Sequence, residues 1–444
     1  MANTQNFGTT LWHSDTLAHS NCVTVSECHC VKVSNIPPPP PRECGFVLWN
    51  GTSVLYLCRA NMTFQNLIKF VYLQFGKNNR LSSRYMADIL SLFSGCGGLD
   101  LGFEQVGGYH TVWANDFNHD ACETFRMHFG DIIREGDIEQ IDPYNDPTIP
   151  NCDLILGGFP CQDFSIIWKQ PGLNGDRGNL YKSFLRFVDA KKPLAFVAEN
   201  VKGILTANGK KAIQQIIEDF QNIEPGYVVI PKLYNFADYG VPEFRERVLI
   251  VGIRSDTGFD FVHPSPSHGE AEGLLPYVTV GDAFKGVADI PHNNEHLRIT
   301  ARTEKVISLI PEGGNFTAIP KDSPYYVKGM ISHVYRRVKL DEPSKTIIAQ
   351  GGGGTWGYHY PENRPLTNRE RARIQSFPDN FVFYGNTTEV RRQIGNAVPP
   401  IGVNALANAL KPLFTGEYER IDLRRRFDEL REMSFADRYR QIKQ

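Results

Sequence analysis

The chain has 444 residues, 41% of them hydrophobic, and a formal net charge of −2. Its length suits two or more domains, and it contains no run of eighteen or more apolar residues, so we expect no membrane span. The near-neutral charge excludes a uniformly basic chain, and any face for nucleic acid must therefore be local. The nine cysteines are unevenly scattered, which argues against a disulfide framework and predicts a reducing compartment.

Residues 1–85 differ in composition from the remainder of the chain. They contain the proline run Pro37–Pro41, which should be extended and solvated, and many Ser, Thr and Asn residues. We expect an N-terminal extension that is disordered or that precedes the natural start at Met86, where compact patterning begins. Cysteine and histidine side chains at positions 22, 28–30 and 44 suggest zinc, but their spacing fits no standard site, so we predict no metal.

Short apolar segments alternate with helical patterns from Met86 to Arg254. This alternation predicts an α/β fold with an open sheet of parallel strands. Ligands of such sheets bind at the carboxyl ends of the strands, so the residues that follow each strand are candidates for a site. Strands are expected at 89–93, 111–114, 154–156, 194–198, 228–233 and 248–253, and helices at 101–106, 119–129, 180–189 and 210–220.

The alternation of strands and helices fails after Arg254. Helical patterns reappear at Thr367 and again near Gln393, and the charged tail is expected to form a surface helix. We therefore predict a catalytic and cofactor-binding domain (86–254), a smaller domain that is irregular or β-rich (255–388), a segment that returns to the catalytic domain (389–415) and a C-terminal tail (416–444).

A glycine-rich turn, Phe93–Gly98, connects the first strand to the first helix. Glycines allow the backbone to pass close to a ligand, and the helix N-terminus offers free N–H groups. Asp116 ends the second strand, at a position where an acidic residue of dinucleotide sites holds a ribose. The pattern indicates a nucleotide-like cofactor, although an ordinary turn has a similar composition.

Reactive side chains follow the next strands at the same edge of the predicted sheet. Pro160-Cys161-Gln162 comes after the buried strand 154–156, and an exposed, activated thiolate is a strong nucleophile. Glu199 ends the following strand, so a carboxylate and a thiol can face one ligand. Arg245 and Arg247 are two residues apart on an extended segment, share a face and suit a phosphate or a base. The alternatives are an inert buried cysteine and a solvated arginine pair.

These residues, in this order, resemble the DNA (cytosine-5)-methyltransferase family of the bacterial restriction-modification type over residues 87 to about 413. One departure is Glu243, since the family usually has glutamine two residues before the first arginine. The matching segments are "FSGCGGLDLGF" (93–103), "GGFPCQDFS" (157–165), "AENVKG" (198–203), "DYGVPEFRERVLIVGIR" (238–254), "RPLTNRERARIQSFPDNF" (364–381) and "QIGNAVPP" (393–400).

The resemblance implies the Rossmann-like open sheet of S-adenosylmethionine-dependent methyltransferases, with a second, smaller target-recognition domain. It implies sequence-specific methylation of carbon 5 of cytosine in double-stranded DNA, through a covalent adduct between Cys161 and a flipped-out base. Glu199 would hold the base at N3 and its exocyclic amine, so its pKa should lie above that of a free Glu. Arg247, with Arg245 nearby, would contact the base oxygen or the adjacent backbone.

The same resemblance implies the residues that bind the cofactor and the DNA. The S-adenosylmethionine site would comprise Phe93, Ser94, Gly95, Gly97, Gly98 and Leu99 around the methionine, Asp116 at the ribose, Phe117, Asp137 and Ile138 at the adenine, and Pro160, Leu180, Asn396 and Val398. DNA contacts would comprise Gln162, Ser165, Lys169 and Arg177 in a mobile loop, and Arg336, Arg337 and Arg369 in the smaller domain. A structural helix face explains the later arginines equally well.

Three rival functions stay open at this point. An RNA (tRNA) cytosine-5 methyltransferase would carry a Cys-Phe-Thr signature in the smaller domain, and residues 255–444 contain no cysteine. A cysteine hydrolase would need a histidine partner for Cys161, and no recognisable partner motif is present. A non-enzymatic DNA-binding relative could lose Cys161 or Glu199, and both are present. The expected partners are double-stranded DNA and a cognate restriction endonuclease, and the expected state is a monomer.

Overall fold

The computed structural model describes residues 46–49, 54–57, 86–159, 180–328, 332–349, 353–355 and 357–443. The chain separates into two units, residues 1–83 and 84–444. In the first unit, strands β1 (Phe46–Trp49) and β2 (Val54–Leu57) form an antiparallel pair, in a region where the sequence indicated no strand. The second unit is not divided further, and the domain boundaries expected within it stay a prediction.

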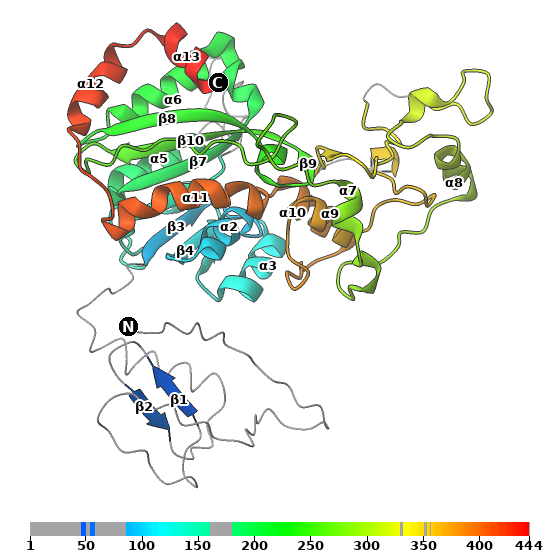
Figure 1. Ribbon diagram of the computed structural model, residues 1–444, viewed down its shortest axis with the longest axis horizontal. Coiled ribbons are helices and arrows are strands. Elements are labelled where there is room, and N and C mark those ends of the chain that lie inside the picture. The colour runs from blue at the N-terminus through cyan, green and yellow to red at the C-terminus, as the bar shows by residue number, and fades with distance from the viewer. Residues whose placement is uncertain are drawn as a thin grey trace, which may run out of the picture. The chain divides into compact units, whose positions relative to one another are not determined.

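A seven-stranded sheet with the order β5-β4-β3-β6-β7-β10-β8 forms the centre of the second unit (Figure 1). All neighbouring strands pair in parallel except those of β10, which is antiparallel to both β7 and β8. This confirms the predicted α/β sheet, with one reversed strand that follows β8 through a short connection. The strands are β3 (Ala87–Leu92), β4 (Tyr109–Asp116), β5 (Ile133–Glu135), β6 (Leu154–Gly157), β7 (Ala195–Val201), β8 (Tyr227–Asn235) and β10 (Glu246–Arg254).

Helices cover both faces of this sheet, and alternate residues of each strand point into two separate cores (Figure 1). On β3, for example, Ile89 packs with one core and Leu90 with the other, and both are fully buried. One core contains side chains of α5 (Leu180–Lys191) and α6 (Lys211–Gln221). The opposite core contains side chains of α2 (Gly98–Val106) and α11 (Pro400–Thr415).

Helix α11 brings the C-terminal part of the chain back against α2. The two helices can approach closely because α2 has Gly102, where an added Cβ would lie 2.4 Å from the Pro400 carbonyl oxygen. The Tyr109 hydroxyl also donates a 2.6 Å hydrogen bond to the Ala407 carbonyl. The sequence predicted one helix from about Gln393, whereas the structure has α10 (Thr387–Asn396) and α11, because Pro399 and Pro400 interrupt the pattern.

Residues 255–386 have few regular elements and two small apolar clusters of their own, one of which includes Val280, Val338 and Ile374. Strand β11 (Ser344–Lys345) pairs in parallel with β9 (Glu243–Phe244) and so joins this region to the strand that leads into β10. The helices here are α7 (Val280–Phe284), α8 (Ala301–Ser308) and α9 (Asn368–Ile374). The second unit also contains helix α3 (His119–Phe129). Short 3-10 turns lie at 138–140, 202–205, 207–210, 236–239, 287–289, 316–318 and 353–355.

The C-terminal tail forms two helices around the edge strand β8, rather than the single surface helix that the sequence predicted. Helix α12 (Leu423–Glu432) buries Phe427 in one core, and α13 (Phe435–Lys443) buries Ile442 in the other. The tail therefore covers an edge that would otherwise be open to pairing with another strand. Within the described ranges, no helix is long and apolar enough to cross a membrane.

Removing the Phe427 ring should destabilise the protein, because this side chain is 8% exposed and packs over Gly226, where an added Cβ would lie 3.0 Å from its Cζ. We expect Phe427→Ala to lower the free energy of unfolding by about 3 kcal/mol in urea titrations. The control is Arg425→Ala, whose side chain is 82% exposed and pairs with Glu429, and it should change stability by less than about 0.5 kcal/mol. Equal effects of the two changes would show that α12 is not packed as described.

Candidate active site

The carboxyl ends of β3, β4, β6 and β7 lie at one edge of the sheet, because these strands are parallel. Several of the predicted site residues lie in or directly after these strands. The segment that follows β6 is described only as far as Phe159. The predicted residues Pro160, Cys161, Gln162, Ser165, Lys169 and Arg177 lie outside the described residues.

The Phe93–Gly98 turn after β3 is tightly packed and conformationally demanding. Phe93, Gly95 and Gly97 have φ values of 55°, 55° and 86° in the left-handed region. A Cβ on Gly98 would lie 2.5 Å from the Val398 carbonyl oxygen, so the turn contacts the returning segment directly. The turn thus brings together two parts of the chain that the sequence assigned to the same cofactor.

Asp116 is held in place beside this turn. Its two carboxylate oxygens accept 2.8 Å hydrogen bonds from the backbone N–H groups of Gly95 and Asn118. Burial raises the pKa of Asp116, and the backbone hydrogen bonds oppose that shift. The neighbouring Phe117 ring is 76% exposed. A fixed carboxylate next to an exposed aromatic ring can accept bonds from hydroxyl groups while the ring stacks on a flat ligand.

The other predicted cofactor residues have mixed surroundings. Asp137 begins a 3-10 turn and accepts a 2.9 Å bond from the Glu139 N–H, whereas the Ile138 side chain is buried in the core. Leu180 is partly buried at the start of α5. Asn396 is exposed at the end of α10, and Val398 is buried against α2.

Glu199 on β7 forms an ion pair with Arg247, with 2.8 Å between Oε1 and Nε. Both side chains are 14% exposed. Burial raises the pKa of the Glu199 carboxyl, and the nearby guanidinium groups of Arg247 and Arg245 oppose this shift. The direction of the shift is the one expected from the sequence. A carboxyl group whose pKa is raised by burial, and which an arginine holds in place, suits proton exchange with a bound ligand.

The end of β6 approaches Glu199 closely because residue 158 is a glycine. An added Cβ there would lie 3.0 Å from Glu199 Oε2. Asn200 Nδ2 donates a 2.8 Å hydrogen bond to the Phe159 carbonyl, so β7 also fixes the chain two residues before Cys161. Asn200 is a residue that the sequence pattern did not single out, although its position in the "AENV" segment was a usable signal.

The two predicted arginines differ in their surroundings. Arg247 lines an open pocket of about 420 Å³ together with Lys202, Phe244 and Thr346. Arg245 is 1% exposed, and its guanidinium donates to the carbonyl groups of three residues from other parts of the chain. The terminal nitrogens of Arg245 are therefore occupied by backbone oxygens. In this conformation Arg245 does not contact a substrate as the sequence predicted.

Two predicted DNA contacts are also engaged inside the protein. Arg337 is 4% exposed and Arg369 is fully buried. Arg369 donates to the carbonyls of residues 292, 378 and 381, and Arg337 to those of residues 307, 310, 359, 361 and 362. These contacts support the structural alternative, so we do not carry either residue forward as a DNA contact. Arg336 remains a candidate because it is only half-buried, although its guanidinium also donates to the carbonyl groups of Ser332 and Gly313.

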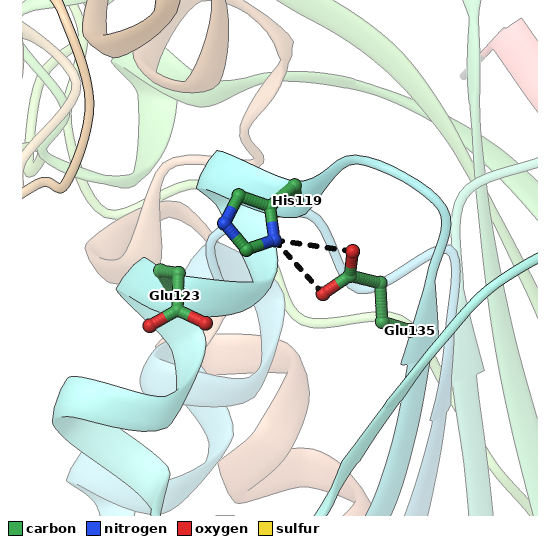
Figure 2. Close-up of side chains that lie close together, drawn as sticks. All are labelled: His119, Glu123 and Glu135. Carbon is green, nitrogen blue, oxygen red and sulfur yellow. Dashed lines mark hydrogen bonds and ion pairs between the residues drawn. The ribbon is translucent and has the colours of Figure 1, made fainter.

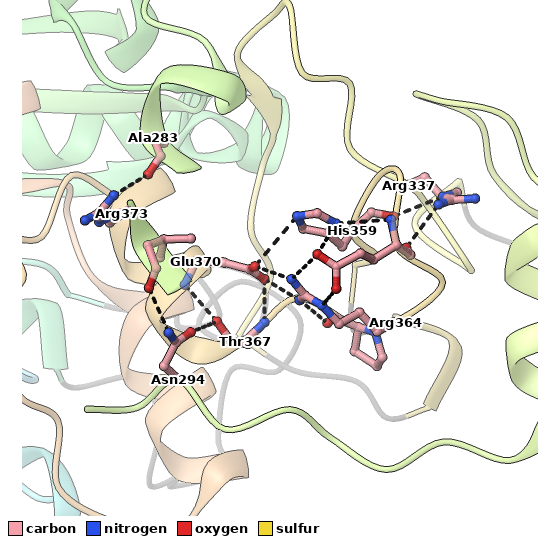
Figure 3. Close-up of polar contacts among 11 residues, drawn as sticks. Ala283, Asn294, Arg337, His359, Arg364, Thr367, Glu370 and Arg373 are labelled. Carbon is pink, nitrogen blue, oxygen red and sulfur yellow. Dashed lines mark hydrogen bonds and ion pairs between the residues drawn. The ribbon is translucent and has the colours of Figure 1, made fainter. Parts of the chain in front are cut away.

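The arginines around α9 form a comparable structural network (Figure 3). Arg364 bonds to Glu370 at 2.7 Å, and Glu370 accepts a 2.8 Å bond from the Thr367 N–H in a capping box. Arg373 donates to the Ala283 carbonyl at 3.0 Å and so ties α9 to α7. These side chains hold the irregular region together because they satisfy carbonyl and carboxylate groups that no strand or helix pairs.

His119, Glu123 and Glu135 form a cluster beside the cofactor edge, with His119 Nδ1 3.1 Å from Glu135 Oε1 (Figure 2). Their spacing alone would suit a cation. However, Arg126 already contacts both carboxylates, at 2.5 Å from Glu123 and 3.4 Å from Glu135. The cluster is therefore an ion-pair network.

Comparisons with known proteins agree with this arrangement. A family model described as C-5 cytosine-specific DNA methylase matches residues 87–412. Type II methyltransferase M.NgoFVII of Neisseria gonorrhoeae is 67% identical over 368 residues, which cover 82% of this chain and 97% of that protein. Type II methyltransferase M.BbvI of Brevibacillus brevis is 38% identical over 342 residues, with 73% and 90% covered.

Solved structures share the fold. A protein described as a DNA modification methyltransferase encoded within an Escherichia coli prophage has a TM-score of 0.57 at 23% identity, over 74% of this chain and 99% of that one. A mutant of Spodoptera frugiperda DNMT2 has a TM-score of 0.52 at 17% identity, over 74% and 99%. At these identities the likeness supports the fold alone.

The close contact at Gly98 predicts that a methyl group there cannot be accommodated, because backbone atoms of the returning segment would have to move. We expect Gly98→Ala to lower the free energy of unfolding in urea by about 1–3 kcal/mol. Gly203→Ala is the control, since its added Cβ would have a single neighbour within 4 Å, at 3.8 Å. A Gly98→Ala protein as stable as this control would contradict the described packing of α2 on residues 397–398.

Proposed function

Since the chain belongs to the C-5 cytosine-specific DNA methylase family, and so is a DNA cytosine-5 methyltransferase of the Type II restriction-modification kind, we propose that it methylates cytosine through a covalent adduct with Cys161. The observation that carries the proposal is the partly buried Glu199–Arg247 pair at the sheet edge. The chain leads directly from this edge, through Phe159, to the cysteine.

The proposed methyl donor is S-adenosylmethionine. The described residues fit it, because the fixed Asp116 carboxylate suits the ribose hydroxyls and the exposed Phe117 ring suits the adenine. The open space at Gly95, where an added Cβ would meet nothing within 4 Å, suits the methionine part. When bound, this cofactor supplies a methyl group on a positively charged sulfur.

The target carbon of cytosine is a poor nucleophile until the ring is activated. In the proposed reaction, the Cys161 sulfur forms a bond to ring carbon 6 while Glu199 donates a proton to N3, which makes carbon 5 electron-rich. Carbon 5 would then take the methyl group as its bond to the sulfonium sulfur breaks, which leaves a neutral thioether. The carbon 5 proton would pass to water, the Cys161 sulfur would leave as a thiolate, and the N3 proton would return to Glu199, which restores the aromatic ring. Arg247 keeps the Glu199 carboxyl in place, and in this proposal it would contact the base oxygen or the adjacent backbone.

The reacting carbon is inaccessible inside a duplex, so the base must first leave the stack, at a cost of roughly a few kcal/mol. The open pocket beside Arg247 adjoins the edge where such a base would bind, and it is also lined by Lys202, whose ammonium group pairs with Glu246. We further propose that the loop after Cys161, with Gln162, Ser165, Lys169 and Arg177, contacts the DNA, as does Arg336. A monomer in the bacterial cytoplasm, paired with a restriction endonuclease of the same specificity, would fit these features.

The competing function is methylation of cytosine in transfer RNA. The fold likeness to a DNMT2 protein does not favour it, because that likeness stands at 17% identity. Residues 255–444 lack the cysteine of the RNA-directed signature, and the relatives at 67% and 38% identity carry the name of Type II methyltransferases. Double-stranded DNA is therefore the proposed substrate.

The nucleophile can be tested with purified protein, unmethylated plasmid and labelled S-adenosylmethionine, followed by bisulfite sequencing. Wild type should place methylcytosine at one short recurring sequence, and Cys161→Ala should lower the rate by several orders of magnitude. A duplex containing 5-fluorocytosine should trap a covalent adduct with wild type and none with Cys161→Ala. Label in transfer RNA with none in DNA would instead establish the RNA function.

The raised pKa of Glu199 predicts how the rate depends on pH. The reaction needs the protonated carboxyl, so kcat should fall as the pH rises through this raised pKa. Glu199→Gln keeps the shape but cannot release a proton, and we expect kcat to fall by about 10²–10⁴-fold and to lose this alkaline limb. A wild-type alkaline limb that persists in Glu199→Gln would assign the titration to another group.

A further inference from the structure

A buried carboxylate, Glu243, lies where β9 meets β11. Its side chain is fully buried, and its Oε1 accepts a hydrogen bond from the Ile347 N–H. Two further bonds hold the same strands together, from the Ser344 N–H to the Pro242 carbonyl and from the Thr346 hydroxyl to the Phe244 carbonyl, both at 2.9 Å. The segment 344–347 is therefore attached along its length to the residues that precede β10.

The second member of the pair is Arg245, whose Nη1 lies 3.8 Å from Glu243 Oε1. Its guanidinium donates to the Ile347 carbonyl at 3.3 Å, the Gly395 carbonyl at 2.8 Å and the Ala397 carbonyl at 3.0 Å. Burial lowers the pKa of Arg245 only to about 10, so the group keeps its charge at neutral pH. One planar cation thus binds two segments that are about fifty residues apart in the chain.

These two segments are also packed directly on each other. An added Cβ on Gly395 would lie 2.4 Å from the Ala349 nitrogen, so the backbones touch at this point. One segment continues to Val398, which contacts the cofactor turn at Gly98. Arg245 is two residues from Arg247, the partner of Glu199. The Glu243–Arg245 pair therefore lies between residues 344–349, the cofactor turn at Gly98 and the Glu199 carboxyl.

We propose that Glu243 and Arg245 are positioning residues, which hold segments 344–349 and 395–398 in register with the strand that carries Arg247. This role rests on the proposed function of Arg247 and Glu199. Loss of the pair should leave DNA bound but misplace the flipped base relative to Glu199. The defect should therefore appear in kcat and in covalent trapping rather than in the KM for DNA.

Two substitutions of Glu243, by glutamine and by alanine, separate the role of its oxygen atom from the role of its charge. Glutamine retains an oxygen for the Ile347 N–H and loses only the charge, whereas alanine removes the acceptor and leaves that N–H buried without a partner. We expect Glu243→Gln to keep kcat within about twofold and Glu243→Ala to lower it about tenfold or more. Arg245→Lys should also lower kcat by about tenfold or more, because an ammonium group cannot reproduce the planar fork.

Arg369→Lys is the matched control, since this buried arginine also donates to three carbonyl groups but is not linked to Arg247. All variants would be assayed for thermal unfolding, kcat, KM for a cognate duplex and trapping by 5-fluorocytosine. A lower melting temperature in both arginine variants with a lower kcat only in Arg245→Lys would support the proposal. The proposal would be overturned if kcat were equal in Arg245→Lys, Arg369→Lys and wild type. It would also be overturned if Glu243→Gln lowered kcat as much as Glu243→Ala does. An inactive wild type would instead refute the proposed function.

Discussion

The parallel alignment of β3, β4, β6 and β7 is the constraint on which the site depends. Parallel strands end at one edge, so residues more than one hundred positions apart, such as Phe93 and Glu199, reach the same end of the sheet. Two glycines at this edge allow neighbouring segments to approach each other closely. Gly158 allows the chain that precedes the cysteine to approach Glu199, and Gly98 allows the cofactor turn to contact Val398. A side chain at either position would separate groups that the chemistry needs close together.

In residues 255–397, buried arginines donate to backbone carbonyl groups that would be paired within helices or sheets in a more regular region. Where the structure describes this region, it has short helices and one two-residue strand, so many of its carbonyl groups lack a partner in a helix or sheet. Arg245, Arg337 and Arg369 each donate to several of these carbonyls from a buried position. A guanidinium offers five N–H groups in one plane and can satisfy carbonyls from different segments at once. The cost of burying the charge is offset by those bonds, and removing a partner would leave it uncompensated.

The sequence predicted the sheet and its edge well, because both depend on local patterns. Nearly all strands of the sheet were identified, with bounds that differ by a few residues, and helix His119–Phe129 was identified in full. Strand β5 was missed because Ile133 is its single apolar residue. The tail was assigned one surface helix, since amphipathic spacing does not reveal that α12 and α13 bury opposite sides of one edge strand.

The sequence by itself determined the family and pointed to the carboxyl group whose pKa burial raises, because short segments such as "GGFPCQDFS" and "AENVKG" carry their chemistry locally. Only the tertiary structure decided which arginines face a pocket and which are buried. Arg245 and Arg247 are equivalent in the sequence pattern, yet one binds carbonyls of residues 347, 395 and 397 and the other binds Glu199. The reason is physical: the surroundings of a side chain are set by segments far away in the chain, and no local pattern records where those segments pack.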